Sequence, residues 1–176
     1  QELLTPKENW GEVILGDIIS SVVDNRGKTP PILNHGIPLL EVNSIGKLHP
    51  RLSNVTKFVS RDIFINWFRN HLEFGDLLFS TVGNTALTSV FGKHKACIAQ
   101  NIVGLRFHKN ISPIFMKFYL STSESMATLK SIEMSAVQPS IKVSQMILLK
   151  FMLPSPSEQI RIASILCDMD AEIETL

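Results

Sequence analysis

The side chains with the clearest chemical potential are a histidine and a cysteine three residues apart. His94 and Cys97 lie in the segment GKHKACIAQ, and such a pair can supply the base and the thiol of a covalent mechanism. In a basic strand and turn, however, a lone cysteine is more often a small buried apolar residue. Cys97 and Cys167 form no CxxC pair and no Cys/His pair at metal-ligand spacing. The pattern predicts no metal site and indicates a reducing compartment.

Sequence motifs of other chemistries are missing. The chain contains no GxxxxGK[ST] phosphate loop, no GxGxxG after a strand, no HExxH, no HxE with PCxxC, and no GxSxG. These motifs mark nucleotide sites, zinc hydrolases, deaminases and serine hydrolases. No glutamate is followed two residues later by lysine, so the ExK of metal-dependent nucleases is missing too. We therefore predict no catalytic residue and no bound cofactor.

Charge is distributed unevenly along the 176 residues. Residues 1–110 hold 12 Lys and Arg, 9 Asp and Glu, and all five histidines, whereas residues 111–176 hold 5 basic and 7 acidic residues. This asymmetry is compatible with polyanion binding by the N-terminal part of the chain, residues 1–110. The chain lacks an apolar run long enough for a membrane span, and its first residues, QELLTPKENW, lack the core of a signal peptide. We predict a cytoplasmic protein without membrane contact.

The elements that must position these side chains are short. A strand-like or short helical stretch is expected over 13–23. Strands are expected within 38–46, where the strand ends in a turn, and within 77–80, 96–108 and 146–153; helices are expected within 60–68, 112–120 and 123–132. A polar loop over 25–36 contains glycine, proline, Arg26 and Lys28, and loops of this length in compact domains are usually functional. Strands dominate the front of the chain and helices the back. We predict an α+β fold, a globular domain over 1–154 with short helices.

The C-terminal segment, 155–176, has a helix start and a heptad spacing. Ser155 suits the N-cap, Pro156 the first helical position, and Glu158 the third position of a capping box. Apolar residues then recur at intervals of 4, 3, 4 and 3, at Ile162, Leu166, Met169, Ile173 and Leu176. Such spacing is typical of a coiled-coil-type helix. An amphipathic helix lying on its own domain is the alternative. Because the net charge from Glu158 onward is −4, we favour a helix that continues in a longer chain or pairs with a partner.

Four segments of the sequence resemble one protein family. The tail LPSPSEQIRIASILCDMDAEI resembles the pattern PLPPxxEQxxIAxxLxxxDxxI, which opens the conserved helices of type I restriction–modification specificity subunits. Upstream, RGKTPPILNHGIPLLEVNSIG, FGDLLFSTVGN and SAVQPSIKVSQMILLKFMLP resemble segments of the family's target recognition domains. The four segments follow the family's order and cover most of residues 10–176.

The sequence also departs from the family pattern. Ser155 separates Pro154 from Pro156 where the family has adjacent prolines, and Ala136 replaces a glycine. Most members carry two recognition domains and two long helices, whereas this chain has one domain and the beginning of one helix. The resemblance therefore implies a fragment or a half-length subunit.

The family resemblance implies a sequence reader and not an enzyme. Its domain, built on a twisted β-sheet, binds one half of a bipartite site in double-stranded DNA. Adenine methylation and cleavage belong to separate modification and restriction subunits, and S-adenosylmethionine, Mg and ATP are expected on those partners only. One domain per chain further suggests a homodimer through the C-terminal helix, which would read a palindromic split site.

Candidate DNA-binding residues lie in polar or basic loops, because base reading needs polar side chains and phosphate contacts need cations or backbone N–H groups. The predicted set is Arg26, Lys28, Thr29, Asn34, His35, Thr81, Gly83, Asn84, Thr85, Lys93, His94, Lys95, Gln138 and Ser140. Isolated cations such as Arg51, Lys57, Arg61 and Arg69 are interpreted as solvated surface residues.

Two other functions remain open at the level of sequence. The domain can be the recognition part of a fused methyltransferase–endonuclease, although no NPPY-like motif is present in this chain. It can also be a protein-interaction module whose helix docks a partner. Salt-dependent binding to duplex DNA separates a DNA reader from such a module.

Overall fold

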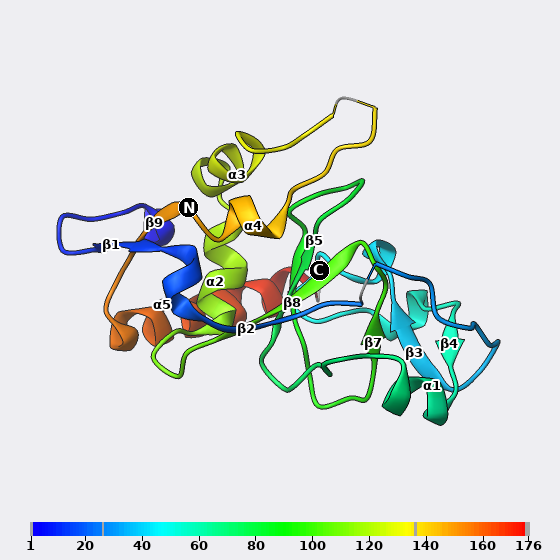
Figure 1. Ribbon diagram of the computed structural model, residues 1–176. Coiled ribbons are helices and arrows are strands. Elements are labelled where there is room, and N and C mark those ends of the chain that lie inside the picture. Colours follow the sequence, from blue (N-terminus) through cyan, green and yellow to red (C-terminus); the bar gives the residue numbers. More distant parts are fainter. Residues whose placement is uncertain (1, 26, 136, 175–176) are drawn as a thin grey trace.

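A four-stranded antiparallel sheet lies at the centre of the computed structural model, which describes residues 2–25, 27–135 and 137–174. Its order is β2 (Ile19–Val23), β8 (Ile102–Phe107), β5 (Leu77–Ser80) and β6 (Thr88–Val90). Figure 1 shows this sheet between a group of helices on one side and a smaller sheet on the other.

The smaller sheet has three short strands and is mixed. β3 (Ile37–Leu40) pairs antiparallel with β4 (Phe58–Val59) and parallel with β7 (Cys97–Ile98). At the start of β3, Gly36 has φ +132°, and a Cβ there would stand 2.5 Å from the Val59 carbonyl oxygen. The close approach of two strands therefore requires glycine at this position. A third, two-stranded sheet pairs β1 (Gly11–Ile14) with β9 (Lys150–Leu153).

The helices are α1 (Arg61–Asn66), α2 (Pro113–Leu120), α3 (Ser123–Lys130), α4 (Val143–Met146) and α5 (Pro156–Glu174). Three of them, α1, α2 and α5, begin directly after the serines expected as N-caps from the sequence, Ser60, Ser112 and Ser155. The Ser60 hydroxyl accepts a hydrogen bond from the Ile63 N–H, and the Ser112 hydroxyl accepts one from the Phe115 N–H. Four short 3₁₀ segments cover Glu2–Leu4, Leu15–Ile18, Val42–Ser44 and Leu52–Asn54. The predicted α+β class is confirmed.

Two predicted stretches differ in detail from the structure. The stretch 13–23, predicted as strand-like or as a short helix, contains both, because the 3₁₀ segment Leu15–Ile18 turns the chain between β1 and β2. The predicted final strand at 146–153 begins only at Lys150, because Met146 is the last residue of α4 and is fully buried. Both stretches are rich in apolar residues, so hydrophobicity alone does not distinguish strand from helix.

The core occupies both faces of the central sheet. Leu77 and Phe79 of β5 point into a cluster formed with α2 and α5, whereas Leu78, between them, packs toward the smaller sheet. All three side chains are fully buried. Trp10 and Phe68 are core residues as predicted, but Trp67 and Phe64 are only half-buried. This sandwiched sheet is the rigid base from which the loops project.

The first turns of α5 belong to this core. Gln159 is 1% exposed, and its side-chain oxygen accepts a hydrogen bond from the Ser112 N–H at 2.9 Å. Ile162 and Ala163 are buried, and Leu166 packs against the same cluster. Predicting Ile162 as a partner-facing residue was therefore wrong, since it faces its own domain.

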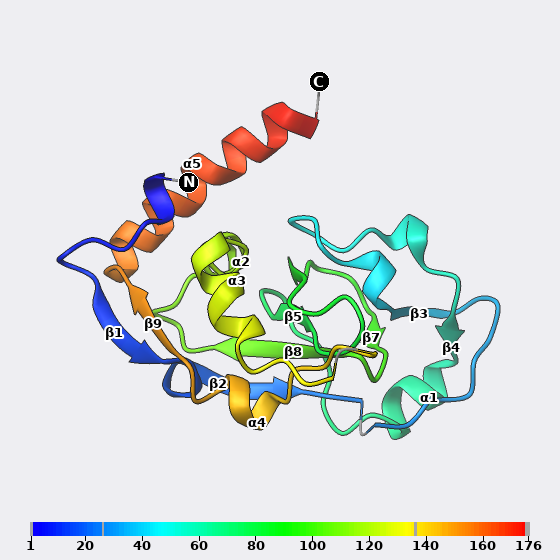
Figure 2. The ribbon, with the colours of Figure 1, turned by 90° about the horizontal axis from the view of Figure 1, so that it is seen from above.

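The last turns of α5 extend away from the sheet of β1 and β9 (Figure 2). Met169 is 50% exposed and Ile173 65% exposed. These two residues remain predicted partner contacts, whereas Leu176 lies outside the described residues.

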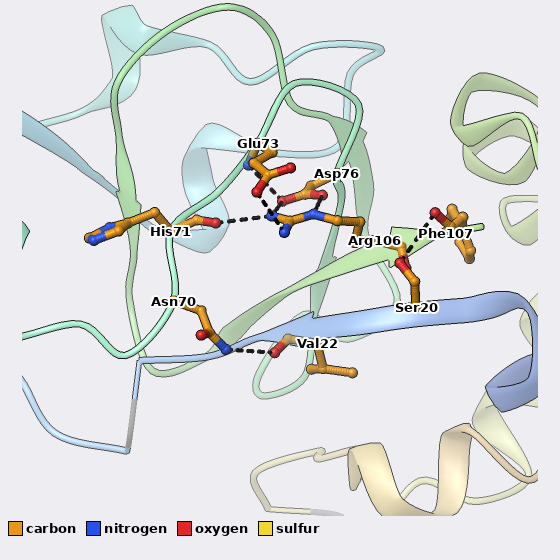
Figure 3. Close-up of polar contacts among 8 residues, drawn as sticks. All are labelled: Ser20, Val22, Asn70, His71, Glu73, Asp76, Arg106 and Phe107. Carbon is orange, nitrogen blue, oxygen red and sulfur yellow. Dashed lines mark hydrogen bonds and ion pairs between the residues drawn. The ribbon is translucent and has the colours of Figure 1, made fainter. Parts of the chain in front are cut away.

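Arg106 on β8 fastens the segment before β5 to the central sheet (Figure 3). Its guanidinium donates to both carboxylate oxygens of Asp76 at 2.9 Å and to the His71 carbonyl oxygen at 3.0 Å. Glu73 adds an ion pair at 2.8 Å. Asp76 is 1% exposed, and its hydrogen bonds raise the pKa of Arg106. The segment 70–76 is thereby held in one position.

Candidate nucleic-acid interface

Three loops predicted separately from the sequence border one hollow of about 570 Å³. Loop 24–36 contributes Gly27 and Thr29, turn 81–87 contributes Gly83, and loop 134–141 contributes Gln138. Turn 81–87 follows β5, and loop 134–141 lies beside it at the top of Figure 1. We call this space the recognition hollow. It brings together residues more than a hundred positions apart in the sequence.

Backbone hydrogen bonds hold the loops around the recognition hollow in a fixed arrangement. The Gly83 N–H donates to the Pro139 carbonyl at 2.8 Å, and the Ile141 N–H donates to the Thr81 carbonyl at 2.8 Å. The Thr81 N–H in turn donates to the Asn101 carbonyl at 2.9 Å. These bonds join turn 81–87 both to loop 134–141 and to the turn between β7 and β8. The rim is therefore a connected framework and not a set of independent loops.

Loop 24–36 is anchored at its start. Asn25 is 2% exposed, and its side-chain amide donates to the Ile98 carbonyl oxygen at 2.8 Å. This bond ties the loop to β7. Thr29 and Gly27 are thus held at the edge of the hollow, although they lie in an exposed and irregular segment.

The rim contains backbone conformations that are rare outside glycine. Ala86 has φ +63° in turn 81–87, and Ser135 has φ +68° in loop 134–141. Each such residue costs about 1–3 kcal/mol. Gly83 has φ +82°, and a Cβ added there would meet no atom within 4 Å. Glycine is therefore favoured at position 83 by the backbone conformation of the turn and not by lack of space, and no side chain covers the backbone there.

Several lining residues were not predicted from the sequence. Gln100 and Asn101 form the turn between β7 and β8, and Gln100 is exposed. Glu41 and Lys57 also line the hollow and form an ion pair at 2.8 Å. In the sequence, the only indication of this side of the hollow is the pair of adjacent amides, Gln100 and Asn101, between two strands. Lys57 was interpreted as an isolated surface cation, because its carboxylate partner is sixteen residues away.

Other predicted residues lie near the recognition hollow without lining it. Asn34, His35 and Asn84 are exposed on loop 24–36 and turn 81–87. Ser140 uses its backbone to close loop 134–141, because its N–H donates to the Met134 carbonyl at 3.0 Å. Arg26 lies outside the described residues.

Two predicted contacts are wrong because their side chains are buried. Thr81 is 7% exposed and Thr85 is 2% exposed. The Thr85 hydroxyl donates to the Glu133 carboxylate, which ties turn 81–87 to the segment after α3. These threonines build the turn and do not face solvent, a distinction that polar composition alone does not reveal.

The basic cluster of Lys93, His94 and Lys95 lies away from the recognition hollow. β5 and β6 form an antiparallel hairpin, with turn 81–87 at one end and the cluster beyond the other. The Lys93 ammonium stands 5.6 Å from the ring centre of Phe74, and all three residues of the cluster are exposed. The structure therefore separates them from Gly83 and Gln138, and phosphate contact by this cluster remains a prediction.

Cys97 is a packing residue and not a nucleophile. It is 4% exposed, and burial raises the pKa of its thiol to about 12. A thiol with such a pKa is almost entirely protonated at neutral pH and is therefore unreactive. The rejection of a His94–Cys97 pair at the level of sequence agrees with this geometry.

Native Cys97 is expected to resist alkylation by iodoacetamide at pH 8, whereas both cysteines react in denaturant. Above pH 9.0, the unfolded-state thiol ionises before the folded-state thiol does, so this group's contribution to stability falls as pH rises toward 12. Mass spectrometry of the alkylated chain provides the measurement. Labelling of native Cys97 as fast as in denaturant would contradict its assigned burial.

Neither a metal cluster nor a membrane helix is found in the described part of the chain. Within residues 2–25, 27–135 and 137–174, no group of three or more His, Cys, Asp or Glu side chains is placed to hold a metal ion. Over the same ranges, every helix is too short or too polar to cross a membrane.

Comparison with known proteins identifies the family. The family model of the type I restriction modification DNA specificity domain matches residues 7–176. The chain belongs to this family. The match includes the domain and the C-terminal helix, so the resemblance seen in four segments is confirmed across the chain. Comparison with curated proteins gives no match.

Solved structures of specificity subunits share the fold. The HsdS subunit from Thermoanaerobacter tengcongensis superimposes with a TM-score of 0.68 at 20% identity, covering 97% of this chain and 40% of that chain. A chain from a study of complex assembly and conformational transition of the type I R-M system gives 0.69 at 19% identity, with the same coverages. The S subunit from M. genitalium gives 0.58 at 15% identity, covering 98% and 42%. This specificity domain thus spans about two fifths of the solved chains.

Proposed function

We propose that this specificity domain reads one half of a bipartite site in double-stranded DNA through the recognition hollow. The observation that carries the proposal is the convergence of Thr29, Gly83 and Gln138 from three separate loops on one hydrogen-bonded rim. Amide side chains such as Gln138 can form paired hydrogen bonds with adenine in the major groove. A rigid rim suits this task, because base reading depends on fixed donor and acceptor positions.

The domain acts without catalysis of its own in this proposal. Modification subunits methylate adenine and a restriction subunit cleaves, in the cytoplasm where the DNA lies. S-adenosylmethionine, Mg and ATP are held by those partners. The buried, protonated Cys97 supports this assignment by removing the one candidate nucleophile that the sequence offered.

The distal half of α5 supports a partner contact. Met169 and Ile173 are exposed, as are Ile160 and Ile165 on earlier turns. Exposed apolar residues along one helix are typical of a surface that packs against another helix. We propose that α5 pairs with a second helix and so sets the distance between two recognition domains, either in a homodimer or with another specificity domain.

Binding of the purified complex to duplex DNA at several salt concentrations tests the proposed function. Because neutralised phosphates release counterions, the logarithm of the affinity should fall linearly with the logarithm of the salt concentration. At fixed salt, one selected sequence should bind far more tightly than a scrambled duplex of equal length. Equal binding of both duplexes would contradict sequence reading, and salt-independent or undetectable binding would favour a protein-interaction module.

A further inference from the structure

A second, smaller hollow lies beside loop 24–36. It measures about 280 Å³ and is lined by Lys28, Asn66, Trp67 and Arg69. Lys28 belongs to loop 24–36, Asn66 is the last residue of α1, and Trp67 and Arg69 follow that helix directly. From the sequence alone, Arg69 is interpreted as a solvated cation, whereas the fold places it at the same hollow as Lys28.

The lining of this second hollow is cationic. Lys28 and Arg69 are exposed, and no carboxylate of the described residues is among the lining side chains. Within the described chain, neither cation forms a hydrogen bond or an ion pair. Asp62, the acidic residue of α1, accepts a hydrogen bond from the Asn66 side-chain amide at 2.7 Å. Two cations without acidic partners at one concave surface indicate an anionic ligand.

Trp67 contributes apolar lining, since it packs against the buried cluster of Leu39, Val59, Phe68 and Cys97. Its indole N–H is buried and has no hydrogen-bond acceptor among the described residues. A buried donor without an acceptor is unusual in folded proteins. The ligand chemistry of the hollow therefore comes from its two cations, because the buried indole nitrogen has no surface that a ligand could reach.

We propose that Lys28 and Arg69 hold a backbone phosphate of the DNA whose bases face the recognition hollow. Lys28 stands between Gly27 and Thr29, both of which line the recognition hollow. Loop 24–36 thus separates a mixed polar hollow, suited to bases, from a cationic hollow, suited to phosphate. The planar guanidinium of Arg69 can form two parallel hydrogen bonds with a phosphate. This inference rests on the proposed function.

The test compares DNA binding of the assembled complex containing the wild-type chain or the double variant Lys28→Ala/Arg69→Ala. Loss of two phosphate contacts should weaken binding about tenfold or more. It should also lower the salt slope by about 0.9, the value for one neutralised phosphate. Specific and scrambled duplexes should be affected equally, because phosphate contacts carry no direct sequence information.

The variant Lys109→Ala controls for the loss of an exposed cation elsewhere on the surface. Lys109 is exposed in the turn after β8, at the end of that strand opposite Asn101 and the recognition hollow. The Lys109→Ala variant should leave both the affinity and the salt slope unchanged. Equal thermal unfolding temperatures of all variants would show that the fold is intact. An unchanged slope and affinity in the double variant, with normal wild-type binding, would overturn the phosphate site alone. Failure of the wild-type complex to bind DNA would overturn the proposed function as well.

Discussion

Replacing Asp76 by alanine is expected to lower the free energy of unfolding by about 3–5 kcal/mol, the usual cost of removing one partner from a buried ion pair. Asp76 is 1% exposed, accepts two hydrogen bonds from Arg106, and also accepts one from the Glu73 N–H at 2.8 Å. Its loss leaves the guanidinium with the exposed Glu73 carboxylate and the His71 carbonyl oxygen. Urea denaturation followed by circular dichroism measures the change.

The Glu12–Lys150 pair provides the control for this experiment. These two side chains are largely exposed, and their ion pair spans β1 and β9 at 2.8 Å. Glu12→Gln should leave the free energy of unfolding nearly unchanged, because exposed ion pairs contribute little. The double variant Asp76→Ala/Arg106→Met should regain part of the lost stability, since no unpaired charge remains. A destabilisation by Asp76→Ala no larger than that of Glu12→Gln would contradict the stabilising role of the Asp76–Arg106 ion pair.

Replacing Gln100 and Gln138 by alanine is expected to relax sequence discrimination by about 1–3 kcal/mol for each base that loses a paired contact. Both amides line the recognition hollow, one from the turn between β7 and β8 and the other from loop 134–141. Competition binding with duplexes that differ at single positions measures this loss. Affinity for scrambled DNA should change little, because phosphate contacts remain.

Gln145→Ala is the matched control, since Gln145 is an exposed amide on α4 that does not line the recognition hollow. Discrimination should be kept in this variant. If the Gln100 and Gln138 variants also kept full discrimination while the wild-type complex bound specifically, base reading would have to lie elsewhere on the surface. Lys93 and Lys95 would then be the next residues to test.

Local elements were predictable because their signals are local. Ser60 and Ser112 cap α1 and α2 through hydrogen bonds to residues three positions ahead. The fully buried strand Leu77–Ser80 was found with its correct bounds, because glycine turns flank it on both sides. Pro156 likewise marked the first residue of α5. These features depend on neighbours within a few residues, which a single sequence contains.

The hollow itself was only partly predictable, because it depends on contacts across the chain. Polar composition identified Thr29, Gly83 and Gln138, but the burial of Thr85 depends on Glu133, 48 residues later. Asp76 and Arg106 are similarly 30 residues apart. Nothing in the local sequence distinguishes a polar side chain that supports a turn from one that faces solvent.

The segments that revealed the family contain residues with structural tasks. Gly36 permits the close approach to β4, Asp76 holds Arg106, and Gln159 joins α5 to the start of α2. The hollow-lining Gln100 and Lys57 lie between these segments and outside them. The resemblance therefore identified a fold with its helix and gave little information on which bases are read.

A genome-wide map of adenine methylation tests the central claim most directly, in a host that expresses this chain with a modification subunit. The account predicts methylation within a split sequence motif, and the Gln100→Ala/Gln138→Ala variant should make one half of that motif degenerate. A palindromic motif would indicate a symmetric pair of these domains, and an asymmetric one a second, different recognition domain. Methylation that ignores sequence, or an unchanged motif in the variant, would contradict base reading at the recognition hollow.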